Sequence, residues 1–474
     1  MKGTSFLLAS VLALGVVAGA AEPSRSAADL KARDIYARII FIPSQLGNGK
    51  VPEVAEYLAG EFRAAGFPAD DIHVLPFKGE GDQTASLVVR YRSKEGGGKG
   101  GKQAKPILLM AHMDVVAAKR EDWQRDPYTL IEENGYFFGR GTYDDKQGVV
   151  ALTSTFLRLK AEKFVPSRDL IIYFSGDEET AQATAIDTAR NHRDLIDAEF
   201  ALNADAGAGT LDESGKALYY SMQTAEKTYA DFTLTTHNAG GHSSLPRPDN
   251  AIYELAVALE KLSRYQPPVM WNDTTLASLR MAGKQIEGEL GAALTRFAAN
   301  PRDSEAAAII AKEPGYNGQM RTTCVATLLS GGHAPNALPQ SASANVNCRI
   351  FPGVKIDDVR RDLQKVVGDG VEVKLVGEPL SSDASPLRQD VVNAVTKAVH
   401  AIHPGTPVVP AQGSGASDGL VFRSIGIPTY GTDGNFMKPN EKFSHGLNER
   451  LTVQSFYDSL TFWHALVTGL AGKR

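Results

Sequence analysis

The sequence is poor in cysteine, in charge of a single sign and in long hydrophobic runs, and each shortage excludes a class of protein. Two cysteines, Cys324 and Cys348, are too few for a domain held together by disulfides. A formal net charge of −5 gives no electrostatic attraction to nucleic acid or to an anionic membrane. Beyond residues 1–20, no stretch is long and apolar enough to predict a transmembrane helix. We therefore expect a soluble protein that binds neither nucleic acid nor membrane.

Residues 1–20 have the composition of a secretory signal peptide. Lys2 gives a positive start, the segment from Phe6 to Val17 is apolar, and Ala18-Gly19-Ala20 is a small-residue cleavage signal. A retained amphipathic helix is the alternative. The signal predicts export, with a bacterial periplasm as the expected compartment.

The two cysteines fall in two expected strands that are joined by a loop centred near Asn336. A symmetric hairpin would place Cys324 and Cys348 opposite one another, and an oxidising compartment permits a disulfide between them. A pair of buried thiols fits the same pattern, so both states remain open at this point.

The spacing of apolar residues predicts an α/β fold with an insertion. Strand-like and helix-like segments alternate over residues 27–219, and this alternation returns in residues 385–474. It is typical of a mostly parallel sheet covered by helices. Residues 220–384 have the pattern of an inserted α+β domain, within which residues 266–322 are expected to form a helical extension.

Side chains that bind metals recur where apolar segments end. These are His112 and Asp114 after PILLMA, Asp144-Asp145 in GRGTYDD, Glu178-Glu179 in GDEET, Asp205 in ALNADAG and His445 in FSHGLNE. Open α/β sheets place their ligand sites beyond the carboxyl ends of their strands. Imidazoles and carboxylates without cysteine suit zinc or a similar divalent metal, and bound metals activate water near neutral pH. Each motif alone also fits a solvated turn or a helix cap, but together and in this order they indicate a metal-dependent hydrolase.

With these motifs in place, the chain resembles the di-zinc exopeptidase and aminoacylase family, which includes glutamate carboxypeptidases, acetylornithine deacetylase and succinyl-diaminopimelate desuccinylase. The resemblance covers about residues 34–465. It implies that residues 27–219 and 385–474 form the di-metal catalytic domain and that the inserted residues 220–384 form a lid or dimerisation domain. It implies two Zn²⁺ per subunit, with Co²⁺ or Mn²⁺ as substitutes. The roles it implies are His112 and Asp205 as ligands of the first metal, Glu179 and His445 as ligands of the second, Asp144 as the bridge, Glu178 as the general base and Asp114 as the residue that orients His112.

The resemblance also implies functional residues outside the metal ligands. Gly240-Gly241-His242-Ser243-Ser244 is similar to a segment whose histidine stabilises the oxyanion, often across a dimer interface, so a homodimer through the inserted domain is allowed. Asn336 and Arg349 resemble the pair that grips the substrate, and a guanidinium suits a free carboxylate. The loop with Gly415 and Ser417 resembles a turn that contacts substrate.

Two segments depart from the family pattern. Asn347 stands where many relatives carry an acid, which puts in doubt how Arg349 is held. The segment ALNADAG, which contains Asp205, matches the usual third-ligand segment only in part.

The expected reaction is hydrolysis of an amide bond next to an amino acid with a free carboxylate, by a carboxypeptidase or dipeptidase that acts on short peptides. Deacylation of N-acyl amino acids is the alternative with the same mechanism. Gly415-Ala-Ser417-Asp-Gly419, followed by Asp433 and His445, also fits a serine hydrolase, although the upstream acids would then have no role. A periplasmic solute-binding protein and a catalytically silent relative are the alternatives without enzyme activity.

Overall fold

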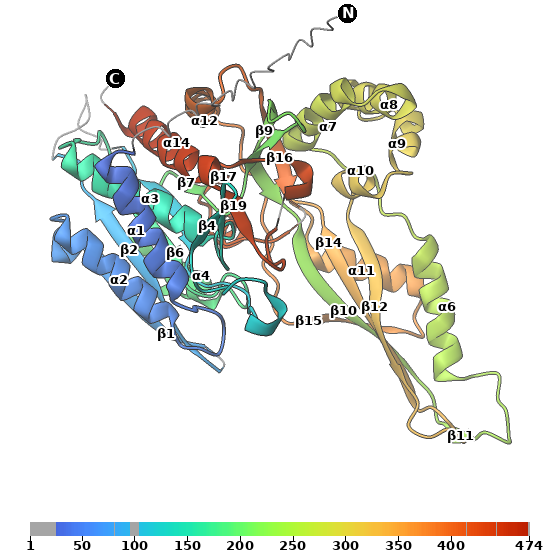
Figure 1. The fold of residues 1–474 in the computed structure, drawn as a ribbon. Helices are drawn as coiled ribbons and strands as arrows, with labels where there is room; N and C mark the ends of the chain where they lie inside the picture. The colour runs from blue at the N-terminus through green and yellow to red at the C-terminus, as the bar shows by residue number, and fades with distance from the viewer. Residues whose placement is uncertain (1–24, 80, 95–103, 414, 442, 473–474) are drawn as a thin grey trace, which may run out of the picture.

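The computed structural model describes residues 25–79, 81–94, 104–413, 415–441 and 443–472, and the predicted signal peptide lies outside these ranges. A large sheet with helices on both faces forms one part of the molecule, and a narrow four-stranded sheet projects from it (Figure 1). This confirms the predicted fold class. None of the helices in the described ranges combines the length and the hydropathy that a bilayer-spanning helix needs.

The large sheet contains the strands that position the predicted ligands. They are β1 (Ile72–Lys78), β2 (Gln83–Tyr91), β3 (Ile107–His112), β6 (Leu170–Ser175), β7 (Phe200–Asn203), β8 (Ala208–Leu211), β9 (Ala217–Glu226), β16 (Val408–Gly413), β17 (Thr429–Gly431) and β18 (Phe436–Met437). Their order is β1-β2-β6-β3-β7-β17-β9-β8-β18, with β16 also paired to β9. The central strands β6, β3, β7 and β17 are parallel, and β3 and β6 are buried along their whole length. Such uninterrupted apolar runs are typical of a sheet covered on both faces.

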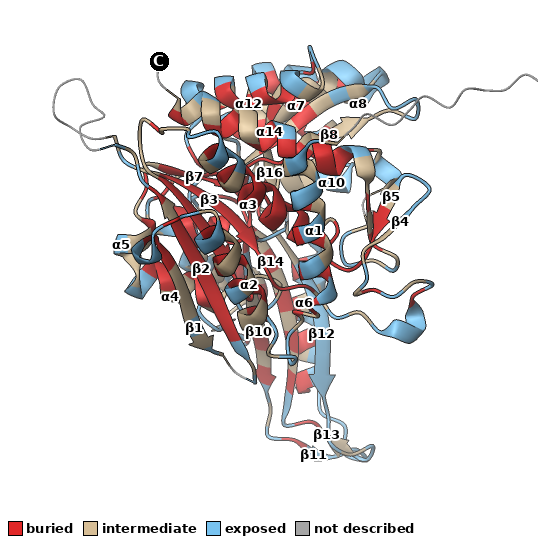
Figure 2. Cartoon of the chain, turned by 60° about the vertical axis from the view of Figure 1, so that its left-hand side comes forward, coloured by how far each residue is buried: buried red, intermediate tan, exposed pale blue. Residues whose placement is uncertain are grey.

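Helices cover the two faces of this sheet. They are α1 (Ala27–Phe41), α2 (Val51–Ala64), α3 (Lys146–Ala161), α4 (Ala183–Asn191), α5 (Arg193–Ile196), α12 (Gln389–Ile402), α13 (Gly419–Ser424) and α14 (Val453–Ala471). Because side chains alternate along a strand, Leu109 joins the core under α1, α2, α3, α12 and α14, whereas Leu108 joins the core under α4, α5 and α13. Figure 2 shows the buried strands between these helical layers.

A small three-stranded sheet joins two functional segments that are far apart in the sequence. Its strands, in the order β19-β5-β4, are β4 (Ile131–Glu133), β5 (Tyr136–Phe138) and β19 (Arg450–Thr452). The GRGTYDD turn follows β5, and His445 precedes β19, so their pairing brings Asp144 and His445 to the same place. Three short 3₁₀ helices, η1 (Ala69–Asp71), η2 (Arg120–Asp122) and η3 (Pro439–Glu441), lie in connecting loops.

The projecting sheet has the strand order β12-β14-β10-β15. Its elements are β10 (Thr228–His237), β12 (Thr323–Gly331), β14 (Ser341–Ile350), β15 (Glu372–Val376) and the helices α6 (Ala251–Arg264) and α11 (Ile356–Val367). Phe232 and Val346 face α6 and α11 and form an apolar core with them. At the far tip, β11 (Gly241–His242) pairs with β13 (Ala337–Leu338).

The predicted helical extension contains α7 (Asp273–Gln285), α8 (Gly288–Ala299), α9 (Ser304–Ile310) and α10 (Pro314–Gln319). These helices share a core of their own. Helix α7 lies beside the large sheet (Figure 1), and the hydroxyl of Thr274 is 2.5 Å from that of Thr224 on β9. The boundary predicted between residues 219 and 220 falls within β9, which remains part of the large sheet as far as Glu226.

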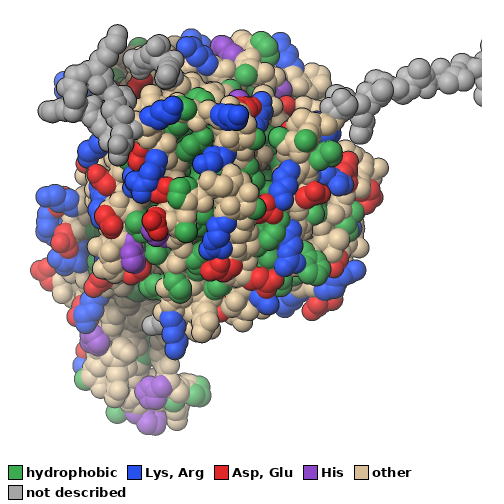
Figure 3. Space-filling view, turned by 90° about the vertical axis from the view of Figure 1, so that its left-hand side faces the viewer, with side chains coloured by type: hydrophobic (Ala, Val, Ile, Leu, Met, Phe, Trp, Pro, Cys, Tyr) green, Lys and Arg blue, Asp and Glu red, His purple; other side chains and the backbone are tan. Residues whose placement is uncertain are grey.

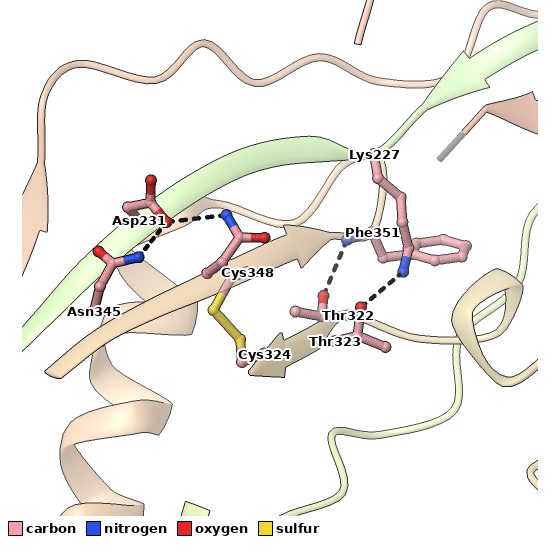
Figure 4. The surroundings of a disulfide bond; sticks show 9 residues. Lys227, Asp231, Thr322, Thr323, Cys324, Asn345, Cys348 and Phe351 are labelled. Atoms are coloured by element: carbon pink, nitrogen blue, oxygen red, sulfur yellow. Dashed lines mark hydrogen bonds between the residues drawn. A yellow bond between two sulfur atoms is a disulfide. The ribbon is translucent and has the colours of Figure 1, made fainter. Parts of the chain in front are cut away.

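A disulfide links Cys324 on β12 to Cys348 on β14. The two residues are direct partners in the register of the antiparallel pair, as the symmetric hairpin predicted (Figure 4). The question left open by the sequence is therefore decided in favour of a bridge.

Candidate metal centre

The predicted ligands converge at one edge of the large sheet. His112 is the last residue of β3, Glu178 and Glu179 follow β6, and Asp205 follows β7. These three strands are parallel and in register, with His112 opposite Ser175 and Met110 opposite Asn203, so their carboxyl ends meet. This is the placement expected for a ligand site in an open α/β sheet.

Asp144 lies between two histidines and faces each with a different oxygen. Its Oδ1 is 3.1 Å from Nε2 of His112, and its Oδ2 is 3.3 Å from Nε2 of His445. Each histidine has a second carboxylate nearby, because His112 Nε2 is 3.7 Å from Asp205 Oδ1 and His445 Nε2 is 2.8 Å from Glu179 Oε2. The result is two groups of donor atoms that share one aspartate.

These donors satisfy the spacing that a metal ion requires. His112, Asp144 and Glu179 offer ligand atoms that all lie within 4.8 Å of one another, and so do His112, Asp145 and Asp205. The peptide bond between Asp144 and Asp145 is cis. In the described residues, Oδ1 of Asp145 is buried without a hydrogen-bond partner.

Buried acids crowd this site, and their pKa values reflect it. Burial raises the pKa of Asp205 to about 7, with further contributions from the charges of Asp144 and Glu179. Burial, together with the charge of Asp205, also raises the pKa of Glu178 well above its usual value. The pKa of His445 rises to about 10 because Asp144 and Glu179 both bond to it. Nitrogen and carboxylate donors packed so closely fit a pair of divalent cations, which would relieve the repulsion between the acids.

The three acids of GDEET divide their roles. Asp177 caps α4, since its carboxylate accepts from the backbone N–H groups of Ala183 and Thr184 at 2.8 and 2.9 Å. This leaves Glu178 and Glu179 for chemistry.

Asp114 has a wider role than the predicted one. Its backbone oxygen is 3.1 Å from His112 Nδ1, and its carboxylate Oδ1 is 3.5 Å from the same atom. The carboxylate also accepts from the backbone N–H groups of Glu178 and Glu179 at 3.1 and 3.0 Å. Asp114 therefore ties the end of β3 to the loop that carries the general-base candidate.

Two cavities adjoin the candidate metal centre. One, of about 330 Å³, is lined by Asp144 and Asp205 together with polar residues of β9 such as Gln223. The other, of about 460 Å³, is lined by Glu178 and Glu179 and by several apolar side chains, namely Ile186, Pro379, Leu380, Ala416 and Leu420. Substrate groups on either side of a scissile bond would have separate places to bind.

Arg349 lies on the projecting four-stranded sheet, on the face opposite the apolar core of that sheet. The Cζ atom of Arg349 is 4.7 Å from the centre of the Tyr229 ring. Tyr229 lines the cavity that contains Glu178, and its hydroxyl donates to Asp231 at 2.8 Å. Asn347 also donates to Asp231, at 2.9 Å, from the position directly opposite in the register. The acid that the family pattern expects at position 347 is thus present across the strand pair, at position 231.

His242 and Asn336 lie at the far tip of the projecting four-stranded sheet, away from the large sheet (Figure 1). Both are exposed, and histidine side chains are visible on this projection in the space-filling view (Figure 3). Arg349 is at the opposite end of β14, on the order of 25 Å away along a strand that rises about 3.3 Å per residue. The structure therefore does not bring His242, or the expected pair of Asn336 and Arg349, together within one chain.

The expected substrate turn contains an exposed residue, Gly415, and a buried one, Ser417. The Ser417 hydroxyl donates to Glu226 and accepts from the side chain of Asn203 at 3.3 Å. His445, the histidine that a serine hydrolase would require, bonds instead to Glu179 and Asp144. Within the described part of the chain, Ser417 and His445 therefore do not form a serine triad.

A family model for peptidases M20/M25/M40 matches residues 108–469, which is more than half of the chain. The chain belongs to this family. Human N-fatty-acyl-amino acid synthase/hydrolase PM20D1 is 28% identical over 374 residues, which cover 76% of this chain and 73% of that protein. The protein is therefore a hydrolase of the metallopeptidase and amidohydrolase type.

Solved structures of the family share the fold. The M20 metallo-carboxypeptidase Sso-CP2 from Sulfolobus solfataricus has a TM-score of 0.66 and 17% identity, covering 92% of this chain and 98% of that one. The YXEP protein of Bacillus subtilis, described as a dinuclear metal-binding peptidase of the M20 family, has a TM-score of 0.55 and 12% identity, covering 92% and 97%.

Glu449 holds the turn that carries Asp144, and the sequence motifs did not predict this role. Glu449 is fully buried, and its Oε1 accepts from the backbone N–H groups of Gly141, Tyr143 and Asp144 at 2.8–3.1 Å. Its Oε2 is 2.5 Å from Nη1 of Arg140. Gly141 has a φ of 86°, and a Cβ there would come within 2.9 Å of Val115, which explains the glycine. Glu449 follows His445 by four residues in FSHGLNE, but nothing in that segment reveals that its partners are backbone groups of a turn far away in the sequence.

Proposed function

We propose that this protein hydrolyses the amide bond next to an amino acid with a free carboxylate, using two divalent cations, with zinc as the first candidate and Co²⁺ or Mn²⁺ as alternatives. The proposal rests above all on Asp144, whose two oxygens face two histidines that each have a further carboxylate beside them. His112, Asp205 and Asp144 would hold one cation, and Glu179, His445 and Asp144 the other. Such a pair supplies a lowered pKa for water and a polarised scissile carbonyl.

Glu178 moves the proton in this reaction. It lines the larger cavity beside the ligands, and its raised pKa suits a group that takes a proton from the attacking water and donates it to the leaving amine. Asp114 holds the backbone of Glu178 and keeps its carboxylate next to the ligands. Arg349 binds the carboxylate of the released residue, because a guanidinium forms paired hydrogen bonds with it.

Short peptides are the first substrate class, as in a carboxypeptidase or dipeptidase. N-acyl amino acids are the second, and one observation favours them: the cavity beside Glu178 has apolar walls formed by Ile186, Leu380 and Leu420. An acyl chain would bury apolar surface there. The similarity to PM20D1 supports the same class.

Export is part of the proposal. Residues 1–20 have the pattern of a signal peptide, and a disulfide joins Cys324 to Cys348. Disulfides persist mainly in oxidising compartments, which include the bacterial periplasm. We therefore place the mature enzyme outside the cytosol.

The functional unit in this proposal is a homodimer that forms through the projecting four-stranded sheet. Strand β12 is at the sheet edge, and its side chains Val325, Leu328 and Leu329 are 58%, 70% and 68% exposed. Tyr253 on the neighbouring helix α6 is 62% exposed. A long apolar edge strand is a template for pairing with another chain. A second copy would bring a second His242 and Asn336, which one chain keeps far from its own metal centre.

A substrate screen tests the proposed reaction. The zinc-loaded protein would be assayed with a panel of dipeptides and a panel of N-acyl amino acids, each compared with the matching C-terminal amides. We expect hydrolysis in at least one panel and a strong preference for the free carboxylate. Hydrolysis of neither panel, or equal rates for acids and amides, would contradict it.

A further inference from the structure

The loop between β6 and α4 contains a residue in an unfavourable backbone conformation close to the general-base candidate. Gln182, at the N-terminal end of α4, has a φ of 51° and a ψ of 24°, which is the left-handed region. Glycine and asparagine adopt this region at little cost, whereas a longer side chain is strained there. Backbone strain of this kind concentrates at functional sites, so the presence of glutamine calls for an explanation.

The left-handed conformation closes the loop. The backbone N–H of Gln182 donates to the oxygen of Asp177 at 2.9 Å, and the Asp177 carboxylate accepts from the N–H groups of Ala183 and Thr184. The chain thus returns to Asp177 after the turn over residues 178–181. Glycine would meet this backbone geometry at least as well, and it is also accepted at a helix N-cap. The benefit of glutamine at this position therefore lies in its side chain.

The side-chain amide of Gln182 bonds to the carboxylate of Glu178. Its Nε2 donates to Oε1 of Glu178 at 3.3 Å. Among the described residues, no other side chain forms a hydrogen bond with that carboxylate. Both residues also line the cavity of about 460 Å³ beside the candidate metal centre. One oxygen of the candidate base is thus held by an amide, and the other, Oε2, has no side-chain partner in the described part of the chain.

Two residues hold different parts of Glu178. Asp114 accepts from its backbone N–H at 3.1 Å, and Gln182 contacts its carboxylate. A glutamate side chain has several rotatable bonds, so a fixed backbone still leaves the carboxylate free to turn. A general base must lie within hydrogen-bond reach of the proton that it takes. An amide N–H fixes one oxygen without adding a charge or a second group that titrates.

We propose that Gln182 is a positioning residue for the reaction, whose amide holds the carboxylate of Glu178 in the orientation that takes the proton from the attacking water. The inference rests on the proposed function, in which Glu178 is the general base, and it adds a residue that acts through that base and not through the metals. The strained backbone at position 182 is then the consequence of placing an amide there.

The test compares Gln182→Met and Gln182→Gly with the wild type on the dipeptide or N-acyl amino acid that the wild type hydrolyses fastest. Methionine has a similar length but no N–H donor, and glycine removes the side chain and suits the left-handed backbone. Both variants should lower kcat by about 10–100-fold with little change in KM, because the carboxylate loses its fixed orientation. The content of bound metal should stay at the wild-type value.

The glycine variant separates positioning from folding. Because Gln182→Gly relieves the backbone strain, its melting temperature should equal or exceed that of the wild type while kcat falls. Lys163→Gly is the matched control. Lys163 is exposed and has a φ of 56° just beyond α3, at the end of that helix that is far from Asp145. This control makes the same backbone change and should leave kcat unchanged.

A double-mutant cycle with Glu178→Gln shows whether the amide acts through the base. If it does, adding Gln182→Met to the Glu178→Gln chain should have little further effect on the residual rate, since the two residues act as a unit. A further loss as large as that of Gln182→Met alone would mean that Gln182 acts independently of Glu178, which would overturn the inference.

The outcomes also distinguish this inference from the proposed function. If the wild type hydrolyses a substrate of either panel and both variants at position 182 retain its kcat, the positioning role is refuted and the reaction stands. If the variants raise KM at constant kcat, or lose metal, Gln182 acts on the substrate or on the structure, and the inference is again refuted. If the wild type hydrolyses neither substrate class, the proposed function itself fails.

Discussion

The carboxyl edge of the large sheet and the tip of the projecting four-stranded sheet both contain residues that the sequence predicts to be functional. The two regions differ in whether those residues lie close together in one chain. At the edge, side chains at or just after the ends of β3, β6 and β7 and in two loops meet at N–O distances of 2.8–3.7 Å. At the tip, His242 and Asn336 are exposed, and His242 contacts only its neighbour Ser244 through its side chain. The comparison teaches that one chain brings the candidate metal ligands together but keeps His242 and Asn336 far from them, which is why we propose a second chain as their link to a metal centre.

Among the predicted variants, Glu178→Gln, at the edge of the large sheet, should have the largest effect on kcat. The variant keeps the shape and the ligands but cannot take a proton, so kcat should fall by about 10²–10⁴-fold. Metal analysis should still find the wild-type content. Glu213→Gln, on an exposed loop, is the control. Substantial turnover in Glu178→Gln would refute the assignment of the base.

His242→Ala should reduce kcat by about 10²–10³-fold if the histidine stabilises the oxyanion. Its position at the tip predicts rescue in trans. Mixing the inactive Glu178→Gln and His242→Ala chains should restore about a quarter of wild-type activity, because half of the dimers are mixed and each has one complete site. Subunit exchange would first be verified. If activity then does not recover, the tip of one chain does not contribute to the metal centre of its partner.

Glu449→Gln should affect the metal centre without touching a ligand. It weakens the three backbone hydrogen bonds to the Asp144 turn and leaves Arg140 without its charged partner. Metal affinity should fall about 10–100-fold, as for other outer-shell partners. Breaking the buried pair should also cost about 3–5 kcal/mol of unfolding free energy, measured by denaturant titration.

The control for this variant is Glu226→Gln, which breaks the other fully buried pair, with Arg423. It should cause a similar loss of stability while metal affinity stays near the wild-type value. Equal losses of affinity in both variants would mean that Glu449 acts through stability alone.

Leu329→Asp should have the smallest and most concentration-dependent effect. A charge on the exposed edge strand β12 should dissociate the dimer, as measured by light scattering after gel filtration. Activity should fall at low protein concentration and recover in part at high concentration. Leu218→Asp, an exposed leucine of β9, should leave both mass and activity unchanged. A wild-type protein that is monomeric at all concentrations would contradict the proposal that the tip of one chain contributes to the metal centre of another.

The sequence predicted the edge well and the tip less well, for a physical reason. Ligands such as His112 and Asp205 follow apolar strands of a parallel sheet, so strand order alone brings them together. No local pattern states how far Asn336 is from Arg349, because both lie in antiparallel strands whose length and pairing decide the distance. Glu449 and Asp231 were missed because their partners are backbone groups or residues on another strand, which the chain order does not reveal.

X-ray diffraction from crystals grown with zinc, recorded at the zinc absorption edge, tests the central claim most directly. We predict two anomalous peaks, one on each side of Asp144, with His112 and Asp205 at the first and His445 and Glu179 at the second. A single peak that does not involve Asp144, or no peak at these residues in zinc-saturated crystals, would contradict the account.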